Sequence, residues 1–276
     1  MPGTLYLVGT PIGNLGDLTP RAAETLRTVD FIAAEDTRVT RKLLTHLETR
    51  KPLIRYCAHT EREQGAAIVQ KLQMGENGAL VTDAGMPAIS DPGAALVALC
   101  AEHDIPVQVI PGPSAVVAGL ALSGFLTGRF TFEGFLSTAR RSRTEHLASL
   151  RTEGRTIVFF EAPHKLPATL ADMLATFGDR RIVLARELTK RYEETIRTTL
   201  RDAAARYSTE KPRGEYVLII EGAAAEPKTD NLDAAVARLH ELLTSNISVK
   251  DAVRQCNAET GVARNVLYPI AIEAND

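Results

Sequence analysis

The first half of the chain repeats one pattern: a short apolar run, a loop containing Gly, Pro or Asp, and then a helical segment. The apolar runs are Leu5–Val8, Val29–Ala34, Leu53–Tyr56, Ala79–Thr82 and Val107–Ile110. Between these runs the apolar residues recur at helical spacing, as at Ile68 and Leu72. Strands that alternate with helices predict βα units and a largely parallel sheet.

After Gly128 the apolar runs become longer and more mixed. We expect strands over Phe130–Phe135, Thr156–Glu161, Arg181–Arg186, Glu194–Leu200 and Glu215–Glu221. We expect helices over Arg141–Leu150, Lys165–Thr176 and Asp202–Tyr207. This half therefore predicts a second α/β domain.

The predicted fold class is α/β, with two domains that each place helices against a sheet, followed by a small helical segment. The predicted bounds are residues 1–112, residues 113–222, a linker over 223–230 and a helical segment over 231–276. In the last segment, Ser248 is expected to cap a helix over Val249–Ala258, and Gly261 to make a tight turn. A shared helical face predicts helix-turn-helix geometry there, formed by Val262, Val266, Leu267 and Ile270.

Composition limits the class of protein. With 45% apolar residues in 276, the chain is able to bury real cores, and it has no run of about 18 apolar residues that would span a bilayer. Its three cysteines, Cys57, Cys100 and Cys256, lie far apart, so neither a disulfide framework nor a zinc site is indicated. We expect a cytoplasmic protein with no membrane span and no bound metal.

Charge is unevenly distributed although the formal net charge is only −2. Residues 129–213 hold seventeen Lys and Arg against eleven Asp and Glu, whereas the segments on either side are net acidic. A basic segment of this kind favours a polyanionic partner, and solvated helix faces rich in Arg remain the alternative. The absence of Trp and the 5% aromatic content argue against a base-stacking platform.

Three loops that follow predicted strands carry the unusual residues. The first, Gly9–Asp17, lacks both the G-x-G-x-x-G spacing of dinucleotide sites and the Gly-Lys-Ser/Thr of a P-loop. The second, Asp83–Gly93, combines two carboxylates with two prolines and two glycines, and the third begins at Pro111. Because the carboxyl ends of parallel strands meet at one edge of a sheet, we expect the three loops to converge on a ligand.

Two of these loops lead into helices with recognisable starts. Thr19 followed by Pro20 places an N-cap hydroxyl before a residue suited to the first helical position. Asp91 followed by Pro92 predicts the same arrangement for a helix over Gly93–Ala101.

Eight motifs resemble those of the S-adenosylmethionine-dependent methyltransferases of the tetrapyrrole methylase superfamily, and within it those of a subfamily that acts on ribosomal RNA. They run in order through residues 5–17, 32–38, 81–93, 111–114, 133–136, 161–165, 185–190 and 214–218. Among them are Gly9-Thr-Pro-Ile-Gly-Asn-Leu-Gly-Asp17 and Thr82-Asp-Ala-Gly-Met-Pro-Ala-Ile-Ser-Asp-Pro-Gly93. The chain departs from the superfamily in its first loop. Other members of the superfamily usually have a Gly-x-Gly-Pro-Gly-Asp pattern there.

The resemblance implies a two-domain fold that binds S-adenosylmethionine in the cleft between its domains. It implies methyl transfer to the ribose 2′-hydroxyl of a cytidine in the decoding region of 16S ribosomal RNA, by a homodimer that acts on the RNA or on the assembled small subunit. The expected cofactor contacts are Pro11, Asp83, Gly85, Ile89, Ser90, Asp91, Pro111, Ser114 and Ala115. No metal is expected, because the sulfonium already activates the methyl group.

Polar residues at strand ends are the candidates for catalysis and RNA contact. The catalytic candidates are Glu35, Asp36, Glu161 and Glu187. The RNA candidates are Arg38, Arg140, Arg141, Arg143, Arg186 and Lys190. Two structural alternatives stay open, in which Asp36 caps the following helix and Glu187 pairs with a neighbouring cation. His164 is either a base or a residue that contacts backbone at a helix start.

Two other functions remain as alternatives. A small-molecule methylase on the same fold would account for the three loops and leave the basic segment without a role. A non-enzymatic RNA-binding module would account for the basic segment and leave the loops without a role.

Overall fold

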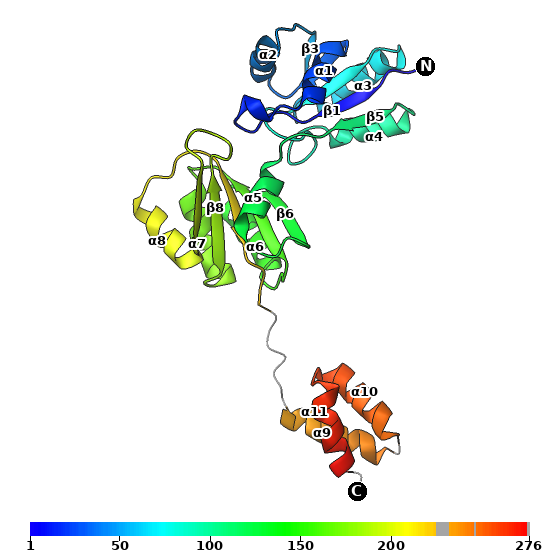
Figure 1. Ribbon diagram of the computed structural model, residues 1–276, viewed down its shortest axis with the longest axis vertical. Coiled ribbons are helices and arrows are strands. Elements are labelled where there is room, and N and C mark those ends of the chain that lie inside the picture. The colour runs from blue at the N-terminus through cyan, green and yellow to red at the C-terminus, as the bar shows by residue number, and fades with distance from the viewer. Residues whose placement is uncertain (225–231, 246, 275–276) are drawn as a thin grey trace. The chain divides into compact units, whose positions relative to one another are not determined.

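The computed structural model describes residues 1–224, 232–245 and 247–274. The chain forms two compact units, Met1–Gly222 and Ala223–Asp276. Two five-stranded sheets lie in the first unit, and the second is helical (Figure 1). The predicted α/β class with a helical C-terminal segment is confirmed. The two sheets share one compact unit, so a domain boundary at residue 112 stays a prediction.

The first sheet is entirely parallel, as predicted. Its strands are β1 (Leu5–Val8), β2 (Phe31–Ala34), β3 (Leu53–Arg55), β4 (Gly78–Val81) and β5 (Val107–Ile110). They lie in the order β3-β2-β4-β1-β5. The connecting helices are the short η1 (Leu15–Asp17) and α1 (Pro20–Thr28), α2 (Thr37–His46), α3 (Glu61–Gln73) and α4 (Ala94–Glu102). The order places β1 between β4 and β5, so the loops that follow these three strands meet at one edge of the sheet.

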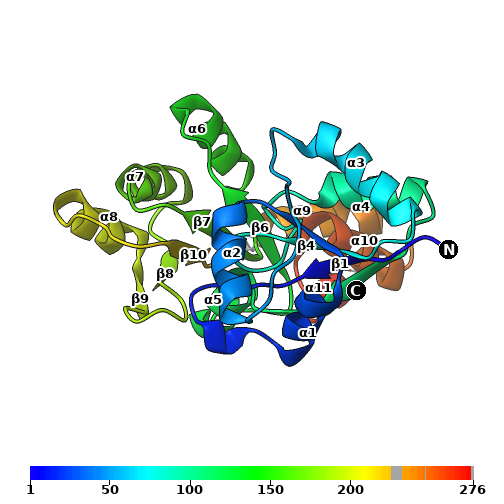
Figure 2. The same cartoon turned by 90° about the horizontal axis from the view of Figure 1, so that it is seen from above.

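Helices cover both faces of this sheet, as the view from above shows (Figure 2). On one face Leu26 of α1 and Leu44 of α2 belong to the same buried cluster as Ile32. On the other face Ile68 of α3 and Leu96 of α4 are buried with the strands. Burial on both faces explains why β2 and β4 are apolar runs without polar alternation.

The second sheet is mixed. Its strands are β6 (Phe130–Phe135), β7 (Thr156–Glu161), β8 (Arg181–Arg186), β9 (Glu194–Thr199) and β10 (Tyr216–Ile220), in the order β6-β7-β10-β8-β9. β6 and β7 are parallel, and the remaining pairs are antiparallel. α5 (Ala115–Ser123) packs on one face. The other face carries α6 (Arg140–Ser149), α7 (Leu166–Phe177) and α8 (Leu200–Thr209).

The helical unit contains α9 (Leu232–Thr244), α10 (Val249–Thr260) and α11 (Arg264–Glu273) around one small core. Ser248 accepts a hydrogen bond from the Asp251 amide and Gly261 has φ +75°, so the predicted cap and turn are confirmed. Val266 is 42% exposed, so its place on the face shared with buried Val262 and Leu267 was predicted wrongly. Most of the predicted linker, residues 225–230, lies outside the described residues.

The two predicted helix caps differ in outcome. Thr19 accepts the Ala22 amide at 3.1 Å, and Pro20 opens α1, as expected. Asp91 does not cap α4, which begins at Ala94 after Gly93 in a positive-φ conformation. Ala88 and Ser90 also have positive φ, and these turns place the Asp91 carboxyl by Thr82. The Gly93 amide donates to a carboxylate oxygen of Glu61 instead.

Candidate functional site

The loops that follow β4, β1 and β5 converge, as the sequence predicted, because these strands are neighbours in the sheet. Thr10 and Gly85 form a backbone bridge, with N–O distances of 2.9 and 3.1 Å. Gly9 and Gly112 are packed so closely that a Cβ on Gly9 would lie 2.7 Å from the Gly112 nitrogen. The loops after β1, β4 and β5 therefore form one surface at the carboxyl edge of the sheet.

Gly85 stands at the centre of this surface. Its φ of +89° is a conformation that side chains rarely adopt, and a Cβ there would lie 3.5 Å from Ile12. The positive φ of the backbone therefore requires glycine at this position, although there is enough space around it for a methyl group.

A carboxylate cluster made of Glu35, Asp83 and Asp91 surrounds Thr82 beside these loops. The Thr82 hydroxyl donates to Glu35 at 2.6 Å, and Asp83 accepts the Asp36 amide at 3.1 Å. Burial, together with the charges of Glu35 and Asp83, raises the pKa of Asp91 to about 6. Burial and then the Glu35 charge also raise the pKa of Asp83. The cluster therefore favours ligands that bring positive charge or hydrogen-bond donors.

Asp36, a predicted catalytic residue, has a structural role. Its carboxylate accepts the Arg38 amide at 2.8 Å as the N-cap of α2 and pairs with the Arg38 guanidinium at 2.5 Å. Hydrogen bonds from Arg38 lower the pKa of Asp36 to about 2. A carboxylate held in this way is a poor proton acceptor near neutral pH, so the geometry favours the capping alternative over the catalytic prediction.

The loop after β8 brings the second half of the unit against the first-half loops. A Cβ on Gly13 would overlap Lys190, and one on Gly134 would lie 2.9 Å from the Ser90 hydroxyl. Lys190 donates to Glu187 and to Glu215, each at 2.8 Å. The loop motifs from both halves are therefore adjacent in space.

Glu187 is one of the predicted catalytic residues in that second-half loop. Burial alone would raise its pKa, but the Lys190 ammonium and the Glu215 amide leave the pKa of Glu187 lowered. This ion pair is the structural alternative that the sequence left open, and it leaves Glu187 unsuited to take up a proton near neutral pH.

Glu161 has a structural role too. It is 2% exposed and accepts hydrogen bonds from the Thr169 hydroxyl at 2.5 Å and from its own neighbour's amide. The Lys165 ammonium lies 3.0 Å away. With its oxygens engaged inside the fold, Glu161 is not placed to act on a substrate, contrary to the prediction. His164, by contrast, is exposed.

The predicted RNA-contacting arginines divide into two groups. Arg143 is 9% exposed, with Asp172 2.7 Å away and hydrogen bonds to the Ser137 and Thr138 carbonyls. Its guanidinium is used inside the fold, so its prediction as a phosphate contact is wrong. Arg140 and Arg141 lie exposed on the first turn of α6.

Ion pairs reduce the free positive charge of the basic segment. Within residues 129–213, all of them described, acidic partners hold nine of the seventeen cations. Arg186, for example, lies 3.0 Å from Glu194 and donates to the Arg213 carbonyl. Counting charge along the sequence therefore overestimated the basic surface available to a polyanion.

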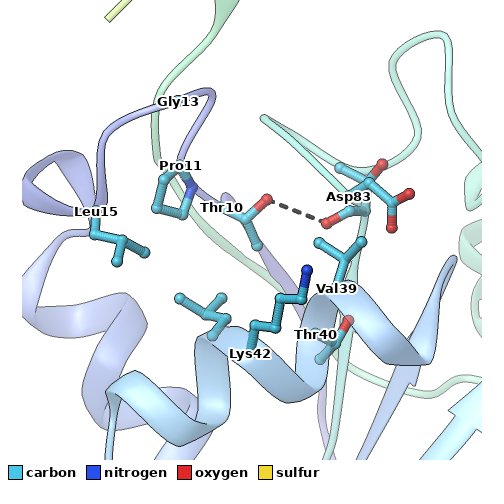
Figure 3. Close-up of a pocket in the computed structure, with 10 residues that line it drawn as sticks. Thr10, Pro11, Gly13, Leu15, Val39, Thr40, Lys42 and Asp83 are labelled. Atoms are coloured by element: carbon cyan, nitrogen blue, oxygen red, sulfur yellow. Dashed lines mark hydrogen bonds between the residues drawn. The ribbon is translucent and has the colours of Figure 1, made fainter. Parts of the chain in front are cut away.

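A cavity of about 240 Å³ lies where the first loop faces α2 (Figure 3). The loop and η1 line it with Thr10, Pro11, Gly13 and Leu15, and the end of β4 with Thr82 and Asp83. α2 contributes Val39, Thr40, Lys42 and Leu43. Sequence reasoning missed the α2 residues because an amphipathic helix with an exposed lysine is an ordinary pattern. The one available signal was that this helix directly follows Glu35 and Asp36.

Within residues 1–224, 232–245 and 247–274, no three His, Cys, Asp or Glu side chains are grouped as metal ligands would be. In the same ranges no helix is long and apolar enough to cross a membrane.

Comparison with known proteins decides the family. The family model for Tetrapyrrole (Corrin/Porphyrin) Methylases matches residues 4–204. The chain belongs to the tetrapyrrole methylase family. Among solved structures, this tetrapyrrole methylase is similar to a cobalt precorrin-4 methyltransferase (TM-score 0.58, 18% identity, 79% of this chain and 94% of that one). It is also similar to a diphthine synthase (TM-score 0.60, 13% identity, 80% and 90%). These likenesses show the shared fold.

Curated relatives are much closer in sequence. A protein of Synechocystis named Ribosomal RNA small subunit methyltransferase I is 48% identical over 273 residues, covering 98% of each chain. Proteins of the same name from Xylella fastidiosa and Escherichia coli O157:H7 are 44% and 41% identical, covering 97% and 98% of this chain and 98% and 95% of theirs. The resemblance thus extends through the helical segment that the family model leaves out.

Proposed function

We propose that this chain transfers the methyl group of S-adenosylmethionine to the ribose 2′-hydroxyl of a cytidine in the decoding region of 16S ribosomal RNA. The observation that carries the proposal is the 48% identity, over 98% of both chains, to a protein named as a small-subunit ribosomal RNA methyltransferase. The proposed substrate is the RNA or the assembled small subunit, in the cytoplasm. A solved structure with the same fold is described as a complex with S-adenosylhomocysteine, which supports the cofactor.

The strand-end loops fit S-adenosylmethionine. Gly9, Gly112 and Gly85 keep side chains away from the edge, so backbone groups are open to a ligand. The Asp83 carboxylate complements a sulfonium or an amino group, and Asp91, which the sequence predicted as a cofactor contact, is assigned to the ribose proton instead. When bound, the cofactor supplies a methyl group already activated by its sulfonium. The remaining proposed contacts are Pro11, Ile89, Ser90, Pro111, Ser114 and Ala115.

The chain must then align the ribose hydroxyl and take up its proton. We assign the proton to the carboxylate cluster, with Asp91 as acceptor and Glu35 as its neighbour across Thr82. A carboxyl with a pKa of about 6 is ionised at neutral pH and more basic than an ordinary aspartate. This assignment replaces Asp36, Glu161 and Glu187, whose carboxylates serve the fold.

Exposed cations supply the RNA contacts in this proposal. The Arg38 side chain is 83% exposed although it pairs with Asp36, and Arg140 and Arg141 face solvent. Lys190 lies beside Gly13 of the first loop. We assign Lys190, with Arg186 four residues before it, to positioning the substrate more than to adding affinity. We also propose a homodimer. Exposed apolar side chains are available for contact between two copies, among them Val109 on the edge strand β5.

Mass spectrometry of 16S ribosomal RNA from cells that lack this protein tests the proposal. The expected result is the loss of one ribose methyl group on a cytidine, restored by the wild-type gene and not by Asp91→Asn. An unchanged set of ribose methyl groups, or a lost methyl group on a base, would overturn it.

A further inference from the structure

The cavity between the first loop and α2 combines three kinds of chemistry. The lining is partly apolar, and two of its apolar side chains, Leu15 and Val39, are 49% and 38% exposed. Asp83, which follows β4, contributes a carboxylate to the lining. An ammonium enters from Lys42, whose side chain extends from α2 toward Thr10 and Asp83 (Figure 3).

Lys42 differs from three other cations near this edge. Arg38 pairs with Asp36, Lys190 with Glu187, and Arg186 with Glu194. Within the part of the chain that the structure describes, Lys42 makes no ion pair or hydrogen bond. An unpaired ammonium beside exposed apolar walls is available to an anionic group of a ligand that also has an apolar part.

We infer that this cavity takes one nucleotide of the RNA substrate, with Lys42 contacting its phosphate. The inference rests on the proposed function and deepens it. A nucleotide has a flat apolar base, a sugar with hydroxyl groups and a negative phosphate. Leu15 and Val39 would contact the base, the Asp83 carboxylate would accept a hydrogen bond from a hydroxyl or an amino group, and the Lys42 ammonium would bind the phosphate.

The position of the cavity supports the same occupant. It shares Pro11 and Asp83 with the loops assigned to the cofactor, so a nucleotide held there would lie next to the methyl donor. Free phosphate is a poorer match, because it has no apolar part to contact Leu15 and Val39. The cofactor itself is the competing occupant, and the test separates the two.

The test is a salt titration of binding to a single-stranded RNA oligonucleotide that contains cytidines, run with Lys42→Met and with Arg41→Met. Arg41 is the matched control, because it is an exposed cation on the same helix that does not line the cavity. Lys42→Met should weaken RNA binding about tenfold, which is about 1.4 kcal/mol. It should also lower the slope of log K against log salt by about 0.7, the value for one lost contact to a single strand. Arg41→Met should keep an affinity and a salt slope close to those of the wild type, because Arg41 does not line the cavity.

Calorimetry with S-adenosylmethionine is the second measurement, and Lys42→Met should bind it with wild-type affinity. A wild-type salt slope in Lys42→Met, or weakened cofactor binding in that variant, would overturn the inference. Wild-type protein that binds RNA but methylates no ribosomal RNA would overturn the proposed function alone, since the binding slopes still decide the role of Lys42. Wild-type protein that binds neither the oligonucleotide nor the small ribosomal subunit would overturn both.

Discussion

Arg143→Ala should destabilise the first unit without changing how the protein binds RNA. The substitution removes the Arg143 guanidinium, which lies 2.7 Å from Asp172, so the Asp172 carboxylate, only 14% exposed, loses its ion-pair partner. The carbonyls of Ser137 and Thr138 also lose the hydrogen bonds that Arg143 donates to them. Removing one partner of a buried ion pair costs about 3–5 kcal/mol, and we expect about 3 kcal/mol because water reaches part of this pair. For a unit of this size, that corresponds to a fall in Tm of about 6–12 °C.

Thermal unfolding followed by circular dichroism measures the effect. Arg141→Ala is the matched control, because its exposed pair with Glu145 is worth about 0.3–0.5 kcal/mol. Arg143→Met combined with Asp172→Leu should recover much of the loss, since it leaves no unpaired charge behind. A Tm for Arg143→Ala within about 2 °C of wild type, or a salt slope for RNA binding that falls only in this variant, would refute the structural role of Arg143.

Two further predictions concern the ligand edge. Gly9→Val should abolish S-adenosylmethionine binding in calorimetry, because its side chain would collide with the Gly112 backbone, whereas Gly128→Ala, where nothing lies within 4 Å, should not. Asp91 has a pKa raised from 3.8 to about 6, so its contribution to stability is complete below about pH 4 and is lost as pH rises through 6. In urea unfolding, the wild-type free energy of unfolding should therefore fall relative to that of Asp91→Asn between pH 4 and 7.

Each of these two predictions has an outcome that contradicts it. Normal cofactor affinity in a folded Gly9→Val protein would show that the contact between the loops after β1 and β5 does not shape the binding surface. A constant difference between wild type and Asp91→Asn across that pH range would show that the Asp91 carboxyl is not perturbed by its burial.

The strands and the loop geometry were predictable because the signals are local. The apolar run Leu5–Val8 indicates a strand, and Thr19 followed by Pro20 indicates a helix start, each within a few residues. In a parallel sheet, the loops that follow the strands all lie at the carboxyl edge. Partners distant in sequence were not predictable. Asp172 lies 29 residues from Arg143 and removes it from the surface.

The same limit applies to the candidate site. Positive φ at Ala88 and Ser90 turns Asp91 from a helix cap into a member of the carboxylate cluster. Lys42 became a candidate only when the fold placed α2 against the first loop.

Methyl transfer by the purified protein tests the central claim most directly. Small ribosomal subunits from cells that lack the protein would be incubated with labelled S-adenosylmethionine, and the labelled position would be mapped by mass spectrometry and by resistance to alkaline cleavage. We predict up to one methyl group per subunit, on the ribose of a single cytidine, with Asp91→Asn strongly slowed in single turnover and Asp36→Asn much less affected. No transfer to subunits or to 16S ribosomal RNA, in protein that binds S-adenosylmethionine, would contradict the account.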